Sequence, residues 1–219
     1  MLDIKRFPDY FQEYNWKNKH HLYGYPPDCC GDFAWINSLE TRFNWLKLNY
    51  ATEKTASIYL IREMIQWGGS QNGVLQKFDD HLGEVNLYEM VAGIISNLNS
   101  TGKAIEAALA IPGMGLTYAS KLLRFLDPEK YGALDSRVRS ALARLASETK
   151  MPKIYDSNAN SMISGYEAFI GYIETLRRQL DVFKLNRPQC VLPMGSGATG
   201  WRASDIEMAL FKWAETNEP

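Results

Sequence analysis

A five-residue turn between two helices constrains the fold of this chain more than any other segment. In the 219-residue sequence, the alanine-rich stretch Ala104–Ala110 is followed by residues 111–115, which read IPGMG. Pro112 disfavours helical geometry at the residue before it and donates no backbone hydrogen bond, so the helix must end there. Gly113 and Gly115 can both adopt the positive φ that a tight turn requires. A second helix follows, because apolar residues recur at helical spacing. They are Ala119, Leu122, Leu123, Phe125 and Leu126.

A third helix is predicted to begin at Asp135, after a break at Asp127-Pro128. Asp is a preferred N-cap residue, so helix capping alone would explain Asp135. The turn 111–115 presents backbone N–H groups at the start of the second helix, where the positive end of the helix dipole lies. Such a turn can bind one phosphate group, and this contact does not recognise the base sequence. The alternative is an ordinary helix–helix turn.

The range Ile111–Arg144 resembles the signature of the helix-hairpin-helix superfamily of DNA glycosylases, which holds endonuclease III, the adenine glycosylases and the 8-oxoguanine glycosylases. The stretch 204–216, SDIEMALFKWAET, is similar to the last helix of short prokaryotic 8-oxoguanine glycosylases. Those proteins finish in a Lys-bearing tail, whereas this sequence finishes in 217–219, NEP, so the resemblance leaves the reading of oxidised guanine open. The family resemblance implies that the partner is duplex DNA, with the target base flipped out of the stack.

The resemblance also assigns roles to residues. It implies that the hairpin residues Gly113, Met114 and Gly115 grip the DNA backbone, and that Asp135 faces the flipped nucleotide. Positive charge builds on the sugar as the base leaves, and a carboxylate close by stabilises that charge or orients an attacking water.

One departure from the family pattern concerns the nucleophile. Bifunctional members carry a Lys as the second residue after the last Gly of the hairpin, and here that residue is Thr117. A Lys amine attacks the sugar, forms a Schiff base and permits strand cleavage, which Thr117 cannot do. Lys121 lies one turn further along the same helix face, with no established reach to the sugar. The resemblance therefore implies a monofunctional glycosylase that leaves abasic sites.

Each of the other residues that could contact DNA has two interpretations. Gln71 and Asn72, within the stretch 68–73, can donate and accept hydrogen bonds and suit base edges or an orphaned partner base; a flexible turn is the alternative. Arg137 and Arg139 give a basic edge near the hairpin, or a solvated helix face.

A flipped base could stack on aromatic side chains, for which Trp67, Trp201 and Phe211 are the candidates; each is equally explained as a core residue. The sequence does not identify the base. Oxidised or alkylated bases in repair, and modified phage bases in antiphage defence, both stay open.

The amino-acid composition argues against several kinds of protein and of site. The net charge of −1 and pI near 6.3 do not indicate a strongly basic nucleic-acid binder. Three cysteines exclude a four-cysteine iron–sulfur cluster, and the adjacent pairs 20–21 (His-His) and 29–30 (Cys-Cys) lack zinc-ligand spacing. We expect no metal and no cofactor, although the resemblance is compatible with a structural monovalent cation at the hairpin. Since no apolar run spans a membrane and no signal-peptide core is present, we expect a cytoplasmic location.

These patterns predict an all-α fold of two packed helical subdomains with a cleft between them, and no strand pattern opposes it. Residues 34–148 would form a helical barrel that contains the hairpin (about 104–126), and residues 1–33 with 149–219 a second subdomain. We expect a monomer. Two other functions stay open, namely a catalytically silent DNA-binding relative and a protein-interaction accessory. DNA affinity separates the accessory protein from the other two.

Overall fold

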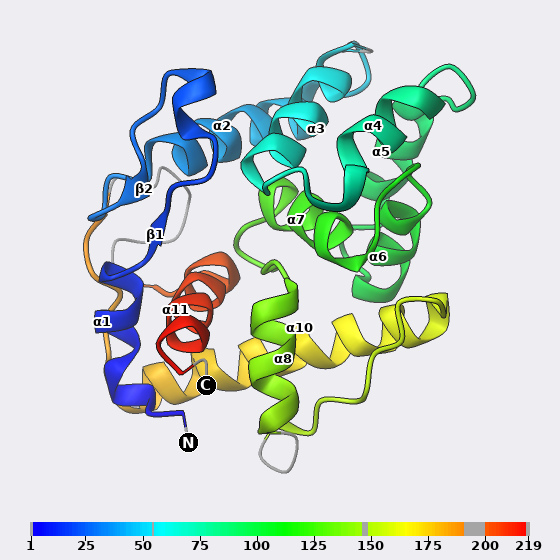
Figure 1. Ribbon diagram of the computed structural model, residues 1–219. Coiled ribbons are helices and arrows are strands. Elements are labelled where there is room, and N and C mark those ends of the chain that lie inside the picture. The colour runs from blue at the N-terminus through cyan, green and yellow to red at the C-terminus, as the bar shows by residue number, and fades with distance from the viewer. Residues whose placement is uncertain (1, 54, 146–148, 191–199, 218–219) are drawn as a thin grey trace.

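The computed structural model describes residues 2–53, 55–145, 149–190 and 200–217. The chain is all-α, as the sequence predicts (Figure 1). The α-helices are α1 (Phe7–Gln12), α2 (Ala34–Asn49), α3 (Ala56–Trp67), α4 (Val74–His81), α5 (Leu87–Ser96), α6 (Thr101–Leu109), α7 (Leu116–Leu126), α8 (Ser136–Arg144), α10 (Ala159–Val182) and α11 (Ala203–Thr216). Short 3-10 turns span Ile4–Arg6, His20–Tyr23 and Gln71–Gly73. The sequence missed a two-residue antiparallel pairing of β1 (Asn15–Trp16) with β2 (Asp28–Cys29).

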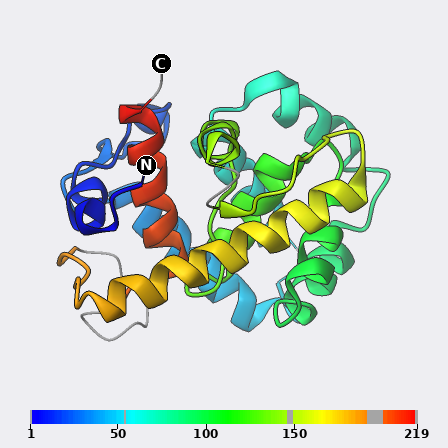
Figure 2. The same cartoon turned by 90° about the horizontal axis from the view of Figure 1, so that it is seen from below.

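The long helix α10 runs along one side of the molecule (Figures 1 and 2). It packs against α6 near one end of the molecule and against α11 near the other, and α2 packs against both α3 and α7. Helix α11 in turn packs against α1 and α8. The division into two subdomains stays a prediction, and residues 1, 54, 146–148, 191–199 and 218–219 of its segments lie outside the described part of the chain.

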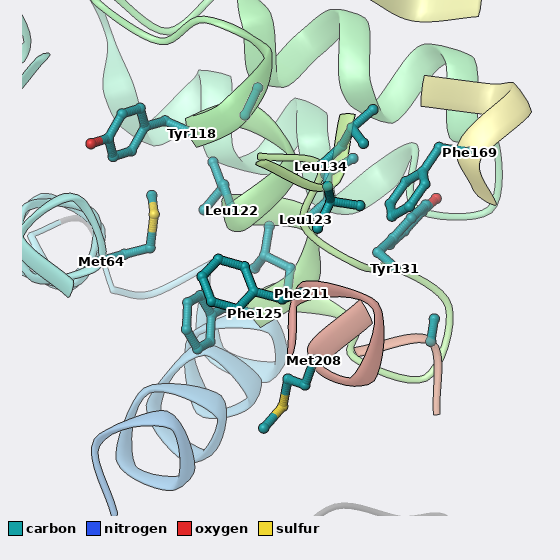
Figure 3. Packing of buried hydrophobic residues seen from close by; sticks show 14 of the residues in the cluster. Met64, Tyr118, Leu122, Leu123, Phe125, Tyr131, Leu134, Phe169, Met208 and Phe211 are labelled. Carbon is teal, nitrogen blue, oxygen red and sulfur yellow. The ribbon is translucent and has the colours of Figure 1, made fainter. Parts of the chain in front are cut away.

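Helix α7 lies at the centre of the packing. Every residue of the range 118–126 is buried, although the sequence predicts an amphipathic helix, because α2, α3 and α6 all contact it. Figure 3 shows Leu122, Leu123 and Phe125 of α7 in one buried cluster, to which α3 contributes Met64 and α11 contributes Met208. The Phe125 ring stacks on Phe43 at 5.7 Å between centroids and meets the Trp67 ring edge-on at 5.0 Å. A helix this enclosed needs a partner for each polar residue that it carries.

One of those residues, Arg124, joins a fully buried ion-pair network. Its Nη1 lies 3.1 Å from Glu40 Oε1, and Glu40 Oε2 lies 2.7 Å from Nη1 of Arg202. Arg202 also pairs with Asp205 at 2.7 Å, and Asp205 with Arg187 at 3.0 Å. Buried charges persist only when paired, so this network fixes α2, α7 and α11 relative to one another.

In the part of the chain that the structure describes, no helix is both long enough and apolar enough to cross a membrane.

Candidate functional site

The hairpin forms between α6 and α7. Gly113 has φ +79°, and an added Cβ there would lie 2.9 Å from Lys77 Cβ, so glycine is required for both conformation and space. Gly115 departs from the expectation of a second positive φ, because it is extended at φ −87°, ψ −179° and serves as the N-cap of α7. Its carbonyl accepts hydrogen bonds from the N–H groups of Tyr118 and Ala119. Met114 is buried and belongs to the hydrophobic core.

A cavity of about 310 Å³ lies over the hairpin. Its lining includes Gly113, Gly115 and Thr117 together with the cations Lys77 and Arg139. Glycine provides no side chain to cap the first N–H groups of α7, which carry the positive end of the helix dipole. The predicted phosphate seat is therefore open and lies beside basic side chains.

Asp135 is the N-cap of α8, as the sequence predicts. Its Oδ1 accepts a hydrogen bond of 2.9 Å from the Val138 N–H, and the helix proper begins at Ser136. Asp135 is half-buried and lines a second cavity of about 330 Å³ next to the hairpin. Asp135 therefore has a structural role as the cap of α8.

The second cavity brings together six of the thirteen predicted site residues, from several elements. It is lined by Trp16, Gly68, Gln71, Thr117, Tyr118, Lys121, Asp135, Ser136, Arg137, Ser140 and Phe211. Thr117 and Lys121 come from α7, Asp135 from the start of α8, and Phe211 from α11. Asn72 lies instead at the hairpin cavity, with a left-handed φ of +56°.

Lys121 reaches this cavity from the buried helix. It is 6% exposed, and its Nζ donates to the Gly68 carbonyl at 3.4 Å. The Nζ lies 5.2, 5.5 and 5.9 Å from the ring centroids of Tyr118, Trp67 and Trp16, respectively. Burial lowers the pKa of Lys121, and the charges of Asp135 and Glu207 oppose that shift.

The three aromatic candidates for base stacking lie in different surroundings. Phe211 lines the second cavity, where its ring meets that of Trp16 edge-on at 5.7 Å and lies 4.8 Å from the Arg137 guanidinium carbon. Trp67 is buried behind the cavity wall, and its Nε1 donates to Asp28 Oδ2. Trp201 does not line the cavity, because it packs on Phe11 and its Nε1 donates to the Leu185 carbonyl.

Two aromatic residues of the cavity escaped sequence analysis. Trp16 comes from the N-terminal arm and is held by β1–β2 pairing and by a 2.7 Å hydrogen bond from its Nε1 to the Trp67 carbonyl. The Tyr118 hydroxyl accepts from the Gln71 N–H at 2.9 Å and donates to the Gly68 carbonyl. Tyr118 thereby fixes the turn that carries Gln71 over the cavity. Neither contact leaves a periodic signal in the sequence.

The two predicted arginines are already paired. Arg139 forms two hydrogen bonds with the Asp156 carboxylate, at 2.5 and 3.0 Å, and that pairing lowers the pKa of Asp156. Arg137 lies 3.4 Å from Glu215. Since both acids are at least partly exposed, these pairs can exchange for a phosphate without leaving a buried charge unpaired.

Glu207 is a further acid near the second cavity, and sequence analysis overlooked it. It is 6% exposed, stands one turn before Phe211 on α11, and its Oε2 lies 3.7 Å from Arg124 Nε. Burial raises its pKa to about 8, with a further rise from Asp135, while Arg124 and Lys121 act in the opposite direction.

Compared with known proteins, the chain matches no family profile, no curated protein and no solved structure. Among the described residues, no group of three or more His, Cys, Asp and Glu side chains has a metal-binding arrangement, and no disulfide involves Cys29, Cys30 or Cys190.

Proposed function

We propose that this chain is a DNA glycosylase of the helix-hairpin-helix superfamily, a cytoplasmic monomer that flips a damaged or modified base out of duplex DNA and releases it by hydrolysis. The observation that carries the proposal is that the Asp135 carboxylate lines a nucleoside-sized cavity directly beside an open helix-hairpin turn. The turn suits a DNA phosphate, and the cavity suits the nucleotide next to it.

The reaction follows from the charges of the cavity. As the N-glycosidic bond stretches, the sugar becomes positive, and a half-buried carboxylate stabilises that charge more than a solvated one would. One Asp135 oxygen is held by the Val138 N–H, which fixes the carboxylate before substrate arrives. Thr117 offers a hydroxyl and no amine, which favours simple hydrolysis at that position.

The flipped base has an aromatic surface available. Trp16 and Phe211 both line the cavity, and Arg137 lies against the Phe211 ring. Stacking on such rings is worth about 1–3 kcal/mol per base, which offsets part of the cost of unstacking. The exposed side chain of Gln71 is suited to the gap left in the duplex.

The test is base release from a panel of oligonucleotides carrying oxidised, alkylated and phage-type modified bases, in duplex and single-stranded form. Wild type and Asp135→Asn are compared, each with and without alkali, because alkali cleaves the strand at an abasic site. The proposal predicts alkali-dependent cleavage of at least one substrate, lost in the variant. DNA binding without any release would indicate a silent binding protein, and the absence of DNA affinity would favour a protein-interaction role.

A further inference from the structure

Lys121 brings a buried ammonium group to the second cavity, and most of its hydrogen-bonding capacity is unused. The residue is 6% exposed, and lysine is rarely this buried without a carboxylate partner. In the described part of the chain no carboxylate forms an ion pair with Lys121, whereas Arg124, one turn further along α7, has Glu40 at 3.1 Å. An ammonium has three N–H donors, and the acceptor that the structure gives this one is the Gly68 carbonyl at 3.4 Å.

The unused donors lie at the wall of the cavity. The Lys121 Nζ lies 5.2 Å and 5.9 Å from the ring centroids of Tyr118 and Trp16. Both of these residues line the cavity, and so does Gly68. A buried donor group is stabilised when an acceptor binds to it, because the bound acceptor offsets the cost of its desolvation. The amine is therefore suited to a ligand that presents an acceptor inside the cavity.

The cavity also holds charges of opposite sign on different elements. The Asp135 carboxylate comes from the start of α8 and the Lys121 ammonium from α7, and no direct ion pair joins these two described side chains. When an N-glycosidic bond breaks heterolytically, positive charge develops on the sugar and negative charge on the departing base. A carboxylate stabilises the first charge and an ammonium stabilises the second.

We infer that Lys121 is the acid of the proposed reaction and gives a proton to the base as that base leaves. The bond between C1′ and the base nitrogen breaks, its electron pair stays on the base, and the Nζ proton passes to the base, which departs neutral. Water adds its hydroxyl group to C1′ beside Asp135, and the other proton of that water restores the Lys121 ammonium. No covalent bond to the protein forms, so the product is an abasic site. The inference rests on the proposed function for the presence of DNA in the cavity.

The surroundings of the amine suit a proton donor. Burial lowers the pKa of Lys121, and the positive charge of Arg124 acts in the same direction, which makes the ammonium a stronger acid. The charges of Asp135 and Glu207 oppose that shift and favour the protonated form. The amine is thus held with a proton that it can release.

This role also names the class of base. A neutral base leaves as an anion unless it is protonated, so its release gains from the Lys121 ammonium. A base with a fixed positive charge, such as 7-methylguanine, leaves as a neutral molecule and needs no proton. The cations Lys121 and Arg137, which both line the cavity, repel such a base. The cavity therefore selects neutral bases and excludes cationic alkylated ones.

The test is single-turnover base release from duplexes that each carry one modified base, either neutral (8-oxoguanine, hypoxanthine or 5-hydroxymethyluracil) or cationic (7-methylguanine). Wild type should release a neutral base and leave 7-methylguanine in place. The rate for the neutral base should fall at least tenfold in Lys121→Gln. It should fall as far in Lys121→Arg, because a guanidinium keeps the charge and does not give up its proton. The matched control is Lys103→Gln, which removes an exposed lysine from α6 and should leave the rate unchanged.

A pH profile distinguishes a proton donor from a residue that only supports the fold. The amine loses its proton as the pH rises through the pKa of Lys121, so wild-type base release should slow there, and Lys121→Gln should lack this decline. Glu207 titrates nearby, with a pKa raised to about 8, so Glu207→Gln is measured as well and should keep the decline. The other ionisable groups around the amine are the same in all three proteins, namely Arg124, Tyr118, Asp135 and Arg137.

Thermal melting of each variant separates a lost proton donor from lost folding. Gly68→Ala keeps Lys121 in the chain and should lose part of the rate, since an added Cβ would lie 3.1 Å from Nζ and must displace it or the ring of Tyr118. Equal release of a neutral base by wild type and folded Lys121→Gln, or release of 7-methylguanine alone, would overturn the inference and leave the proposed function standing. Absence of release from every duplex would overturn both.

Discussion

The Ser120 hydroxyl oxygen accepts a hydrogen bond of 2.9 Å from the backbone N–H of Leu134. Ser120 precedes Lys121 on α7, and Leu134 precedes Asp135, so this one contact ties the segment carrying the carboxylate to the helix carrying the amine. Both residues of the contact are buried. The Ser120 hydroxyl in turn donates to the Thr117 carbonyl at 3.0 Å. The relation between the two functional groups of the cavity is thus held by fixed backbone rather than by long side chains.

Replacing Ser120 by Ala should loosen this relation. The variant leaves the buried Leu134 N–H without its acceptor, which costs about 1–3 kcal/mol in the free energy of unfolding. Base release should slow while DNA affinity stays near the wild-type value, because Asp135 loses its support and the hairpin does not. The exposed Ser164→Ala variant is the control and should change stability by less than about 0.5 kcal/mol. Equal base release in Ser120→Ala and wild type would contradict the positioning role.

The two hairpin glycines should respond differently to alanine. Gly113→Ala puts a Cβ at positive φ and 2.9 Å from Lys77 Cβ, so unfolding should become easier by about 1–3 kcal/mol. Gly115→Ala meets nothing within 4 Å at an ordinary φ, and its stability should change by less than about 1 kcal/mol. Chemical denaturation of both variants measures this difference. Similar losses in the two would show that the turn is not held as described.

Glu207 should make stability fall with rising pH. Its pKa is raised to about 8 in the folded chain, mainly by burial, against about 4.3 for an unperturbed glutamate. Between those values the folded state keeps a proton that the unfolded state has lost, so the free energy of unfolding decreases as pH rises and levels off above about pH 8.

The Glu207→Gln variant removes this titration. Relative to wild type it should gain about 2–4 kcal/mol between pH 5 and pH 8.5, measured as the difference between the two unfolding curves. Arg124, Lys121, Asp135 and Tyr14, which interact electrostatically with Glu207, are present in both proteins. Parallel stability curves for the two proteins would refute a raised pKa at Glu207.

We expect Asp156 to weaken DNA binding, because its carboxylate pairs with the Arg139 guanidinium, which would otherwise be available to a DNA phosphate. Both residues line the hairpin cavity. Asp156→Asn frees this guanidinium for a phosphate, and we expect DNA affinity to rise about 2–10-fold at low salt, with a smaller gain at high salt. Asp181→Asn makes the same charge change at an exposed position near the end of α10. If both variants gain equally, net charge is the cause and Arg139 has no special part.

The sequence predicts the hairpin and its two flanking helices because Pro112, Gly113 and the N-cap Asp135 are local signals, each acting within a few residues. The residues that complete the cavity are different. Trp16 arrives through the pairing of β1 with β2, and Glu207 lies beside the cavity only because α11 packs on α8. Contacts between distant segments leave no local pattern, so the sequence could indicate Asp135 as a candidate but could not indicate the residues that surround it in the cavity.

The burial of polar residues in the protein interior was equally hard to predict from the sequence. Amphipathic spacing correctly marks the apolar positions of α7, but it gives no sign that the polar residues Lys121 and Arg124 are buried as well. Both are buried because α2, α3 and α6 enclose the helix, and their partners Gly68 and Glu40 are far away in the chain. Trp201 illustrates the reverse case, in which an aromatic residue suited to a base pocket lies in the core.

The most direct measurement is mass spectrometry of the free bases released from lesion-containing duplex DNA under single-turnover conditions. Asp135→Asn is the matched variant, because asparagine caps a helix about as well as aspartate and only the negative charge is lost. The account predicts one released base above background with wild type, and a rate at least about 100-fold lower in a folded, DNA-binding Asp135→Asn. Release at the wild-type rate in Asp135→Asn would contradict the account, because the carboxylate would then have no part in the chemistry.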